Sequence, residues 1–388
     1  MEGERLQRLP LPENLLGQGL ILTSLALMAM GVVMAVSTAS ADGAARAWYY
    51  RRDIRQAFFV AAALPVLLTL WRVDYRRLAR RPWPESRVLG WVPSPAVALL
   101  LVGLVTAVMV LLFGHGVGHR LRWLRYGPIG FQPSEVVKFA VLIVLAVFLS
   151  RPDCRPRDFR RTFLPAIMLV GLACGLVVTQ DFGTAAIIGM AAAAMMLMAG
   201  AAWHHFLAPA PAVALGVYWF MVRDAHRWAR IQALMEPLTS SRPAAYQPRQ
   251  ALIAVASGAA PAGLGAGVAK HGYLPEDSTD FIFSTVCEEL GVGGMVLVIG
   301  LFLVWLWLCR RAVLGAADRF AALLAGGLGF VVGLQAVIHI AVNVRWFPPT
   351  GVCLPFLSAG GTSLLAMTAA TAIIVSVSAR RRVEPETL

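Results

Sequence analysis

Ten apolar stretches, each long enough to form a membrane-spanning helix, are the feature that most limits how this chain can fold. A helix needs about 20 predominantly apolar residues to cross the hydrocarbon core of a bilayer. Only 14% of the residues are charged and the mean hydropathy is +0.69, which excludes an ordinary soluble domain. We therefore predict an all-α integral membrane protein, a single polytopic domain over residues 1–388. The ten candidate spans lie near residues 16–38, 54–71, 94–113, 133–150, 162–179, 183–200, 203–222, 281–308, 319–344 and 361–379.

The placement of Lys and Arg predicts the orientation in the membrane. With the N-terminus in the cytoplasm, the inside segments hold 19 of the 34 basic residues. The outside segments hold 15, of which six lie in the long loop 223–280, and long loops count for little. We therefore expect a multi-pass protein with both termini in the cytoplasm and with 223–280 as a large extracytoplasmic loop. The net charge of +13 reflects this bias and favours anionic lipid, and no nucleic-acid partner is expected because no basic run lies in a soluble module.

The loop 223–280 contains three kinds of sequence. Residues 223–238 have apolar side chains at helical spacing and predict an amphipathic helix, which lies either on the membrane interface or packed on the bundle. Residues 239–250 are rich in proline and are expected to be irregular. Residues 251–270 are small and rich in glycine, which suits close packing or a re-entrant turn.

Charged residues inside the spans are the first candidates for a functional site, because a charge in hydrocarbon is costly. Lys138 is one of only two lysines, and Glu135 lies three residues before it, on the same helix face. The pair either serves function or is a structural ion pair. Glu288 and Glu289 are adjacent and therefore point to different faces, so at least one must meet a polar cavity or a cation.

Polar segments at the outer ends of the spans form a second group of candidates. Arg122 and Trp123 suit phosphate and sugar, respectively, although an interfacial belt has the same composition. Asp181 is placed to cap the helix that follows it. The Gly-rich segment that contains Ser358, Gly360, Gly361, Thr362 and Ser363 reads either as a broken turn whose N–H groups bind an anion or as the plain start of a helix.

The segment YLPEDSTDFIF, residues 273–283, places three acids within five residues at the edge of an apolar run. Asp280 touches this run directly. Its spacing alone allows a helix cap or a solvated acid as well as a catalytic role. The five cysteines have no CxxC or paired spacing, so neither a disulfide framework nor a zinc site is expected.

Together these segments resemble the SEDS family of bacterial cell-wall proteins, which includes FtsW, RodA and SpoVE. The resemblance covers all ten spans, and its most specific part is LPE..TDFIF followed by EELG. It implies a peptidoglycan glycosyltransferase that polymerises lipid II at the outer face of the cytoplasmic membrane, for cell division or elongation. It also implies a class B penicillin-binding protein as transpeptidase partner, within a divisome or elongation complex. The matching residues are 122–138, 180–184, 246–250, 263–291 and 348–365.

The resemblance also implies roles for individual residues. Asp280 matches the essential acid of the family, and Glu135 and Lys138 match residues that line the cavity beneath it. We expect Asp181, Glu276, Glu288 and Glu289 to support the site. The candidates for binding substrate and its pyrophosphate are Lys138, Glu135, Arg122, Trp123, Gln132, Ser134, Lys270, Gln250, Thr279, Ser358, Gly360, Gly361 and Ser363.

A donor of this kind carries lipid pyrophosphate on a sugar C1, and the acceptor sugar has a free 4-OH. Pyrophosphate leaves without protonation once its charge is balanced, so one base suffices and the anomeric centre inverts. Asp280 suits this base, because partial burial beside Phe281 and Phe283 would raise its pKa. Lys138, Arg122, Lys270 or a divalent cation, Mg²⁺ or Mn²⁺, would balance the pyrophosphate. Glu276 and Asp277 are weak candidate metal ligands, and no organic cofactor is expected.

The sequence departs from the family pattern at a few positions. Ser278 replaces a usual His, Ala359 a usual Tyr, and Gly272 a common acid, while Gly118 and His119 stand where Asn-Gly often occurs. Two other functions remain open: a lipid II flippase, and a non-catalytic scaffold for the transpeptidase. A flippase needs charges along a path through the bilayer, whereas here they gather at one face, which favours the polymerase.

Overall fold

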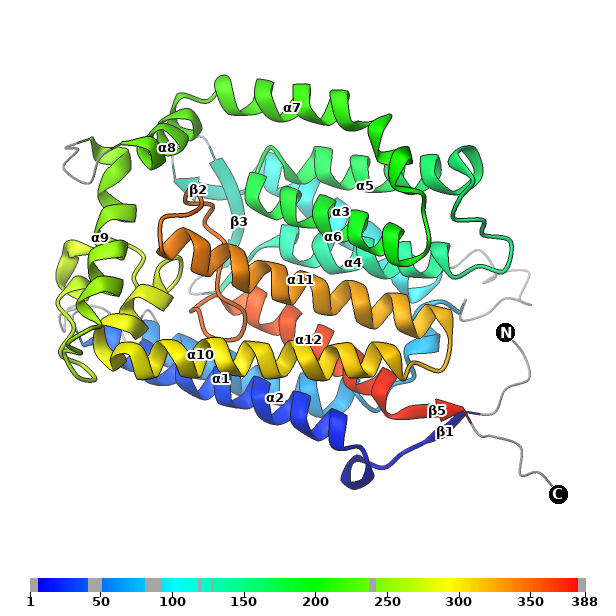
Figure 1. Ribbon diagram of the computed structural model, residues 1–388, viewed down its shortest axis with the longest axis horizontal. Coiled ribbons are helices and arrows are strands. Elements are labelled where there is room, and N and C mark those ends of the chain that lie inside the picture. Colours follow the sequence, from blue (N-terminus) through cyan, green and yellow to red (C-terminus); the bar gives the residue numbers. More distant parts are fainter. Residues whose placement is uncertain are drawn as a thin grey trace.

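The computed structural model describes residues 6–40, 51–80, 93–117, 120–126, 129–236 and 242–382. The long helices run side by side along the long axis of the molecule (Figure 1). Gly118 and His119 lie outside the described residues. The helices are α1 (Leu15–Ala39), α2 (Arg52–Leu70), α3 (Pro95–Phe113), α4 (Pro133–Leu149), α5 (Leu164–Val177), α6 (Phe182–Met198), α7 (Ala210–Val222), α8 (Ala225–Met235), α9 (Pro243–Ser257), α10 (Ile282–Leu314), α11 (Arg319–Asn343) and α12 (Gly361–Ser378).

Each predicted span contains a helix, so the expected all-α membrane fold is confirmed, although the count of ten spans is not. Among the described residues, seven helices are long and apolar enough to cross a membrane. The helices α6 and α7 are apolar but shorter, and α4 carries the charged pair. Proline divides the predicted span 203–222 into a short turn, Trp203–Leu207, and the 13-residue helix α7, none of whose residues is buried. The seven are α1, α2, α3, Phe159–Val177, α10, α11 and α12.

The two ends of the bundle differ. At one end the short strands β1 (Leu6–Arg8) and β5 (Arg380–Arg382) pair antiparallel. We call this end of the bundle the termini end. The opposite end carries the antiparallel sheet β2 (His115–Val117), β3 (Arg120–Tyr126) and β4 (Ile129–Phe131), together with α8, α9 and residues 344–360 (Figure 1). We call this the large-loop end. These strands were not predicted from the sequence.

The long loop is more regular than its composition suggests. The amphipathic segment forms α8, which packs on α7 and α9 and hydrogen-bonds to the loop between α11 and α12. The expectation of irregular structure over 239–250 is wrong from Pro243 onward, where α9 begins. Proline lacks an N–H and has a helical φ, so it suits the first turn of a helix. Pro243 therefore marks the start of a helix rather than a loop.

The start of α10 is bent at Gly291, and this bend sets the direction of its first turns. Gly291 has φ 66°, a left-handed conformation that favours glycine. A Cβ at this position would lie 3.0 Å from the Gly258 carbonyl oxygen and from Pro261. The close approach ties the first turns of α10 to the end of α9. The helix α11 occupies the centre of the bundle and is mostly buried, so its polar side chains face other helices.

Candidate active site

Asp280 lies in the turn that precedes α10, at the large-loop end. Asn343, at the end of α11, is buried and donates from Nδ2 to the Asp280 carbonyl at 3.2 Å. The Asn343 side-chain oxygen accepts from both the backbone N–H and the hydroxyl of Ser284, at 3.0 and 2.7 Å. Two spans therefore hold the backbone of Asp280 through one buried amide, whose polar groups are satisfied.

The segment before α12 is hydrogen-bonded to the same turn. Ser358 Oγ donates to the Thr279 carbonyl at 2.8 Å. The Ala359 N–H donates to the Ser278 carbonyl at 3.0 Å. Since the second link uses only backbone atoms, the departures from the family pattern at Ser278 and Ala359 leave it intact. Ser358, a predicted substrate-binding residue, hydrogen-bonds to the loop that carries Asp280.

Arg122 faces Asp280 across Gly351. A Cβ at Gly351 would lie 3.2 Å from Arg122 Nη1 and 3.5 Å from Asp280 Oδ2, so both groups border the same space. Gly351 has φ 74°, and glycine leaves this space open. The Arg122 Nε donates to the Gln180 carbonyl at 3.0 Å, which orients the guanidinium. An arginine and a carboxylate from distant segments thus meet at one point.

Electrostatics make Asp280 suitable as a base near neutral pH. Burial raises the pKa of Asp280 to about 6, and the nearby negative charge of Glu276 adds to the rise. The positive charges of Arg122 and Arg230 hold this pKa down, and Asp181 raises it slightly. At neutral pH the group is therefore ionised and yet a better proton acceptor than an ordinary aspartate.

Glu135 and Lys138 form an ion pair in the first turns of α4, 2.8 Å between Glu135 Oε2 and Lys138 Nζ, with both side chains almost fully buried. Lys138 also donates to Gln335 Oε1 at 2.7 Å. Gln335 Nε2 in turn donates to the Cys353 carbonyl at 2.9 Å. This chain of contacts runs from α4 through α11 to the loop beside Asp280.

The thiol of Cys353 is influenced by several of these charged side chains at once. Burial raises the pKa of this thiol well above its usual value, and the charges of Asp280 and Glu135 act in the same direction. Lys138 opposes them, and Asp181 adds to the rise. One side chain therefore lies within electrostatic reach of the acid, the intramembrane pair and the helix cap.

Asp181 caps α6, as the sequence predicts, and it also contacts the start of α4. It accepts from the Thr184 N–H at 3.3 Å and from the Thr184 hydroxyl at 3.0 Å. Gln132 Nε2 donates to Asp181 Oδ2 at 3.3 Å and to Ser134 Oγ at 3.1 Å. The start of α4 is thereby joined to the start of α6, close to Asp280.

Other residues predicted to bind substrate have the following packing contacts in this structure. Trp123 covers Gly130 of the adjacent strand, where a Cβ would lie 3.2 Å from its ring. A Cβ at Gly361 would clash with the Phe59 ring at 2.3 Å, so this glycine lets α12 approach α2. Ser363 is buried in the first turn of α12, and Gly360 precedes it. Gln250 lies half-buried on α9, which packs against α8, α10 and α11.

Lys270, predicted from the sequence to balance the pyrophosphate, forms a buried ion pair with Glu289. Its ammonium contacts Glu289 Oε1 at 3.0 Å and the Gly265 carbonyl at 2.6 Å, and both charged side chains are fully buried. Ser37 Oγ at the end of α1 donates to the same carboxylate. Glu288 accepts from the Val268 N–H at 2.9 Å and also from the Ala269 N–H. A buried carboxylate needs a counterion, and Lys270 supplies it here.

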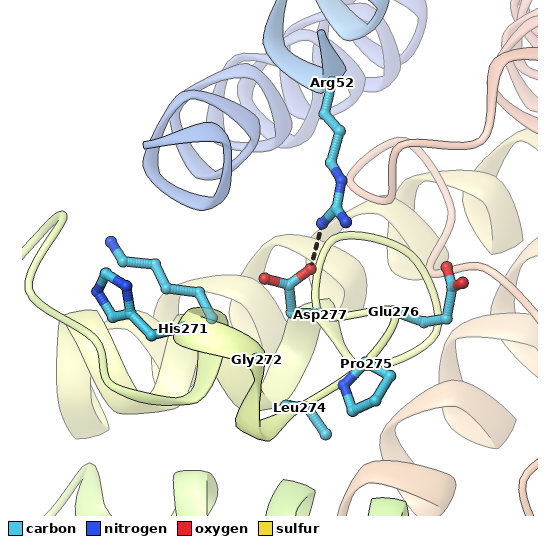
Figure 2. Close-up of a pocket in the computed structure, with 8 residues that line it drawn as sticks. Arg52, His271, Gly272, Leu274, Pro275, Glu276 and Asp277 are labelled. Atoms are coloured by element: carbon cyan, nitrogen blue, oxygen red, sulfur yellow. Dashed lines mark hydrogen bonds and ion pairs between the residues drawn. The ribbon is translucent and has the colours of Figure 1, made fainter. Parts of the chain in front are cut away.

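A polar cavity of about 380 Å³ opens beside the Asp280 turn (Figure 2). Arg52 Nη1 lies 2.6 Å from Asp277 Oδ1 within it, and the Glu276 carboxylate lies apart from this pair. Glu276 instead accepts from Thr279 Oγ1 at 2.9 Å. The two carboxylates therefore do not form one ligand set for a metal. Among the described residues no cluster of three or more His, Cys, Asp or Glu has metal-binding geometry.

Four residues of the candidate site were not predicted from the sequence. Gln335, His339 and Asn343 are spaced by four along the predicted span 319–344, so they form one polar stripe, which was a readable signal. His339 Nδ1 donates to the Val352 carbonyl at 2.8 Å. Because a carbonyl oxygen can only accept, Nδ1 carries the proton. Arg230 lies fifty residues before Asp280 in the chain, and no local pattern connects the two.

Comparison with known proteins agrees with this architecture. The family model described as cell cycle protein, FtsW/RodA/SpoVE, matches residues 18–383. A probable peptidoglycan glycosyltransferase FtsW from Halomonas elongata is 34% identical, covering 94% of this chain and 92% of the relative. A protein of the same name from Idiomarina loihiensis is 33% identical over 92% of this chain and 86% of its own length.

Two solved structures share the fold. A chain from a peptidoglycan synthase complex superposes with a TM-score of 0.74 at 24% identity, covering 93% of this chain and 97% of that one. The rod-shape-determining protein RodA from Thermus thermophilus superposes with a TM-score of 0.64 at 24% identity, covering 93% of this chain and 95% of its own. With the family model matching nearly its whole length, this chain belongs to the FtsW/RodA/SpoVE family.

Proposed function

We propose that this chain is a peptidoglycan glycosyltransferase that polymerises lipid II, the undecaprenyl-pyrophosphate-linked disaccharide peptide, into glycan strands. The observation that carries the proposal is the half-buried Asp280 facing Arg122 across Gly351. An acid with a raised pKa opposite a fixed guanidinium is the arrangement that transfer from a sugar pyrophosphate requires. The names of the curated relatives support the same activity.

In the proposed reaction the acceptor hydroxyl attacks the donor C1 on the face opposite the pyrophosphate. The new C1–O bond forms as the C1–O bond to pyrophosphate breaks, and the electron pair leaves with the lipid pyrophosphate. The hydroxyl proton passes to Asp280. Arg122 is oriented by the Gln180 carbonyl and balances the negative charge that develops on the leaving group. The configuration at C1 inverts in this single step.

We place the large-loop end at the outer face of the bacterial cytoplasmic membrane and both termini in the cytoplasm, as the Lys and Arg distribution supports. The proposed partner is a class B penicillin-binding protein, which would crosslink the glycan, within a division or elongation complex. A structural neighbour that belongs to a peptidoglycan synthase complex supports such an assembly. Dependence on Mg²⁺ or Mn²⁺ stays a proposal, since Glu276 and Asp277 have separate partners.

The decisive experiment gives purified protein labelled lipid II in detergent and in vesicles. We expect glycan chains from the wild type and a loss of about 10²-fold or more in chain formation from Asp280→Asn, because the base is removed. The variant should still insert in membranes and bind its transpeptidase. The Ser278→Ala variant, whose backbone link remains, is the matched control in the same turn.

Each rival function predicts another result in this assay. Translocation of lipid II across vesicles without chains would indicate a flippase. Neither chains nor translocation, with stimulation of a bound transpeptidase, would indicate a scaffold. Chains of normal length and yield from Asp280→Asn would refute the assignment of the base.

A further inference from the structure

A second arginine reaches the site from the large loop. Arg230 lies on α8, and its Nη1 donates to the Pro349 carbonyl at 2.9 Å. Pro349 is two residues before Gly351, the glycine that Arg122 and Asp280 both border. The charge of Arg230 also acts on Asp280, in the same direction as that of Arg122. The helix α8 therefore brings a cation to the catalytic carboxylate from a part of the chain remote in sequence.

The segment that receives Arg230 is held from two directions. From within the bundle, α11 binds the Val352 carbonyl through His339 at 2.8 Å and the Cys353 carbonyl through Gln335 at 2.9 Å. From the large loop, Arg230 binds the carbonyl at position 349. Gly351 lies between these attachments. Its position beside Asp280 thus depends on α11 and on α8 together.

Arg345 locks α8 in this place. Its Nη2 donates to the Ala233 carbonyl at 2.7 Å and also to the Glu236 carbonyl, both at the C-terminal end of α8. Cations stabilise this end of a helix, where carbonyl groups lack partners. Arg345 itself has φ 59°, which is unfavourable for a residue other than glycine. Such a conformation persists only where surrounding contacts stabilise it.

We propose that Arg230 is a second cation of the active site, delivered by α8 and locked by Arg345, which positions residues 349–351 and stabilises the departing pyrophosphate together with Arg122. This inference rests on the proposed glycosyltransferase function. Two guanidinium groups that approach from different elements suit a pyrophosphate, whose charge is spread over two phosphate groups. The transfer step keeps the balance given above, since Arg230 exchanges no proton and forms no covalent bond.

The first test compares Arg230→Gln with Arg230→Lys in the lipid II assay. We expect Arg230→Gln to lower kcat by about tenfold or more. It should also move the acid limb of the pH–rate profile to higher pH, because a positive charge near Asp280 is lost while Arg122, Glu276 and Asp181 remain. Arg230→Lys should restore the position of the limb. A purely structural residue would lower the rate without moving the limb, and Lys would not restore it.

The matched control is Arg227→Gln on the same helix. Arg227 pairs with Asp224 and stacks on Phe220, so its loss removes the same charge from α8 at a position that has other partners. It should leave the pH limb in place. The Arg345→Ala variant should behave like Arg230→Gln, and the double variant should be no worse than Arg230→Gln alone. Additive losses would show that Arg345 does not act through Arg230.

A binding measurement separates this inference from the proposed function. Polyprenyl pyrophosphate is titrated into wild type and Arg230→Gln in detergent, with polyprenyl monophosphate for comparison. Tighter binding of the pyrophosphate, lost in Arg230→Gln, supports the role of Arg230 even if no chains form and the polymerase proposal fails. Chain formation with unchanged binding and an unchanged pH limb in Arg230→Gln would overturn the inference and leave the polymerase intact. Equal binding of both lipids by wild type would also overturn it.

Discussion

At the scale of single residues, the chemistry depends on where Asp280 is held rather than on the acid alone. Three acids lie within five residues, but they have different surroundings. Asp277 is paired with Arg52, and Glu276 is exposed and contacts Thr279. Only Asp280 is both half-buried and opposite Arg122. Its neighbours therefore distinguish the proposed base from two acids that are chemically similar.

The pKa of Asp280 predicts the pH dependence of the reaction. A carboxyl group with a raised pKa stays protonated to higher pH than a free aspartate, so the base is lost as pH falls through about 6. We expect the initial rate of chain formation to fall about tenfold per pH unit below that point. Arg122 holds the pKa down, so Arg122→Gln should move this limb upward. A limb near pH 4, the value of an ordinary aspartate, would contradict the assignment.

At the scale of elements, the first turns of α10 are held by a buried polar cluster. Glu289 of α10, Lys270 of the large loop and Ser37 of α1 join three segments, while Glu288 binds backbone N–H groups of the loop. These contacts and the bend at Gly291 fix where α10 begins, and Asp280 lies just before that point. The cluster therefore helps to position the acid through the first turns of α10.

The ion pair in this cluster predicts how the stabilities of single and double variants compare. Lys270→Met or Glu289→Gln alone leaves one buried group without its counterion, and we expect each to cost about 3–5 kcal/mol. The double variant removes both charges, so its loss should be smaller than the sum. Thermal unfolding of the purified proteins in one detergent measures this. Strictly additive losses would mean that the ion pair is not coupled, and the exposed substitution His271→Ala in the same segment is the control.

At the scale of the whole molecule, the candidate active site and the chain termini lie at opposite ends of the bundle. The strands β1 and β5 pair at one end, and β2, β3, α8 and α9 lie at the other (Figure 1). Arg122 of β3 and Asp280 border Gly351 at that second end, and Arg230 of α8 binds the Pro349 carbonyl there. A polymerase that uses a lipid-anchored substrate needs its charges gathered at one membrane face. The helix α7 connects the bundle to α8, the helix that carries Arg230. None of the residues of α7 is buried, so α7 packs little against the bundle.

The separation of the two ends predicts opposite accessibility across the membrane. In a background with the five native cysteines replaced, His271→Cys at the large-loop end should react with an impermeant maleimide added to whole cells. Asp153→Cys, exposed between α4 and α5, should react only after permeabilisation. Mass-tag gel shifts report both. The reverse pattern would place the proposed active site in the cytoplasm and refute the orientation.

The sequence by itself determined the membrane class, the positions of the long helices and the candidate acid. Helix formation in lipid depends on local composition, because a spanning segment must satisfy its own backbone hydrogen bonds. All ten predicted spans therefore contain helices, and the cap at Asp181 was readable from its neighbours. The local failures have local causes, such as the start of α9 at Pro243 and the division of a span near Pro209.

Only the tertiary structure decided which charges meet. Lys270 lies ten residues before Asp280 and yet pairs with Glu289, while Arg230 lies fifty residues away and its charge acts on the acid. Such pairings depend on how helices pack and on the need of each buried charge for a partner, and neither is encoded by spacing along the chain. The stripe formed by Gln335, His339 and Asn343 was visible in the sequence, but its contacts were not.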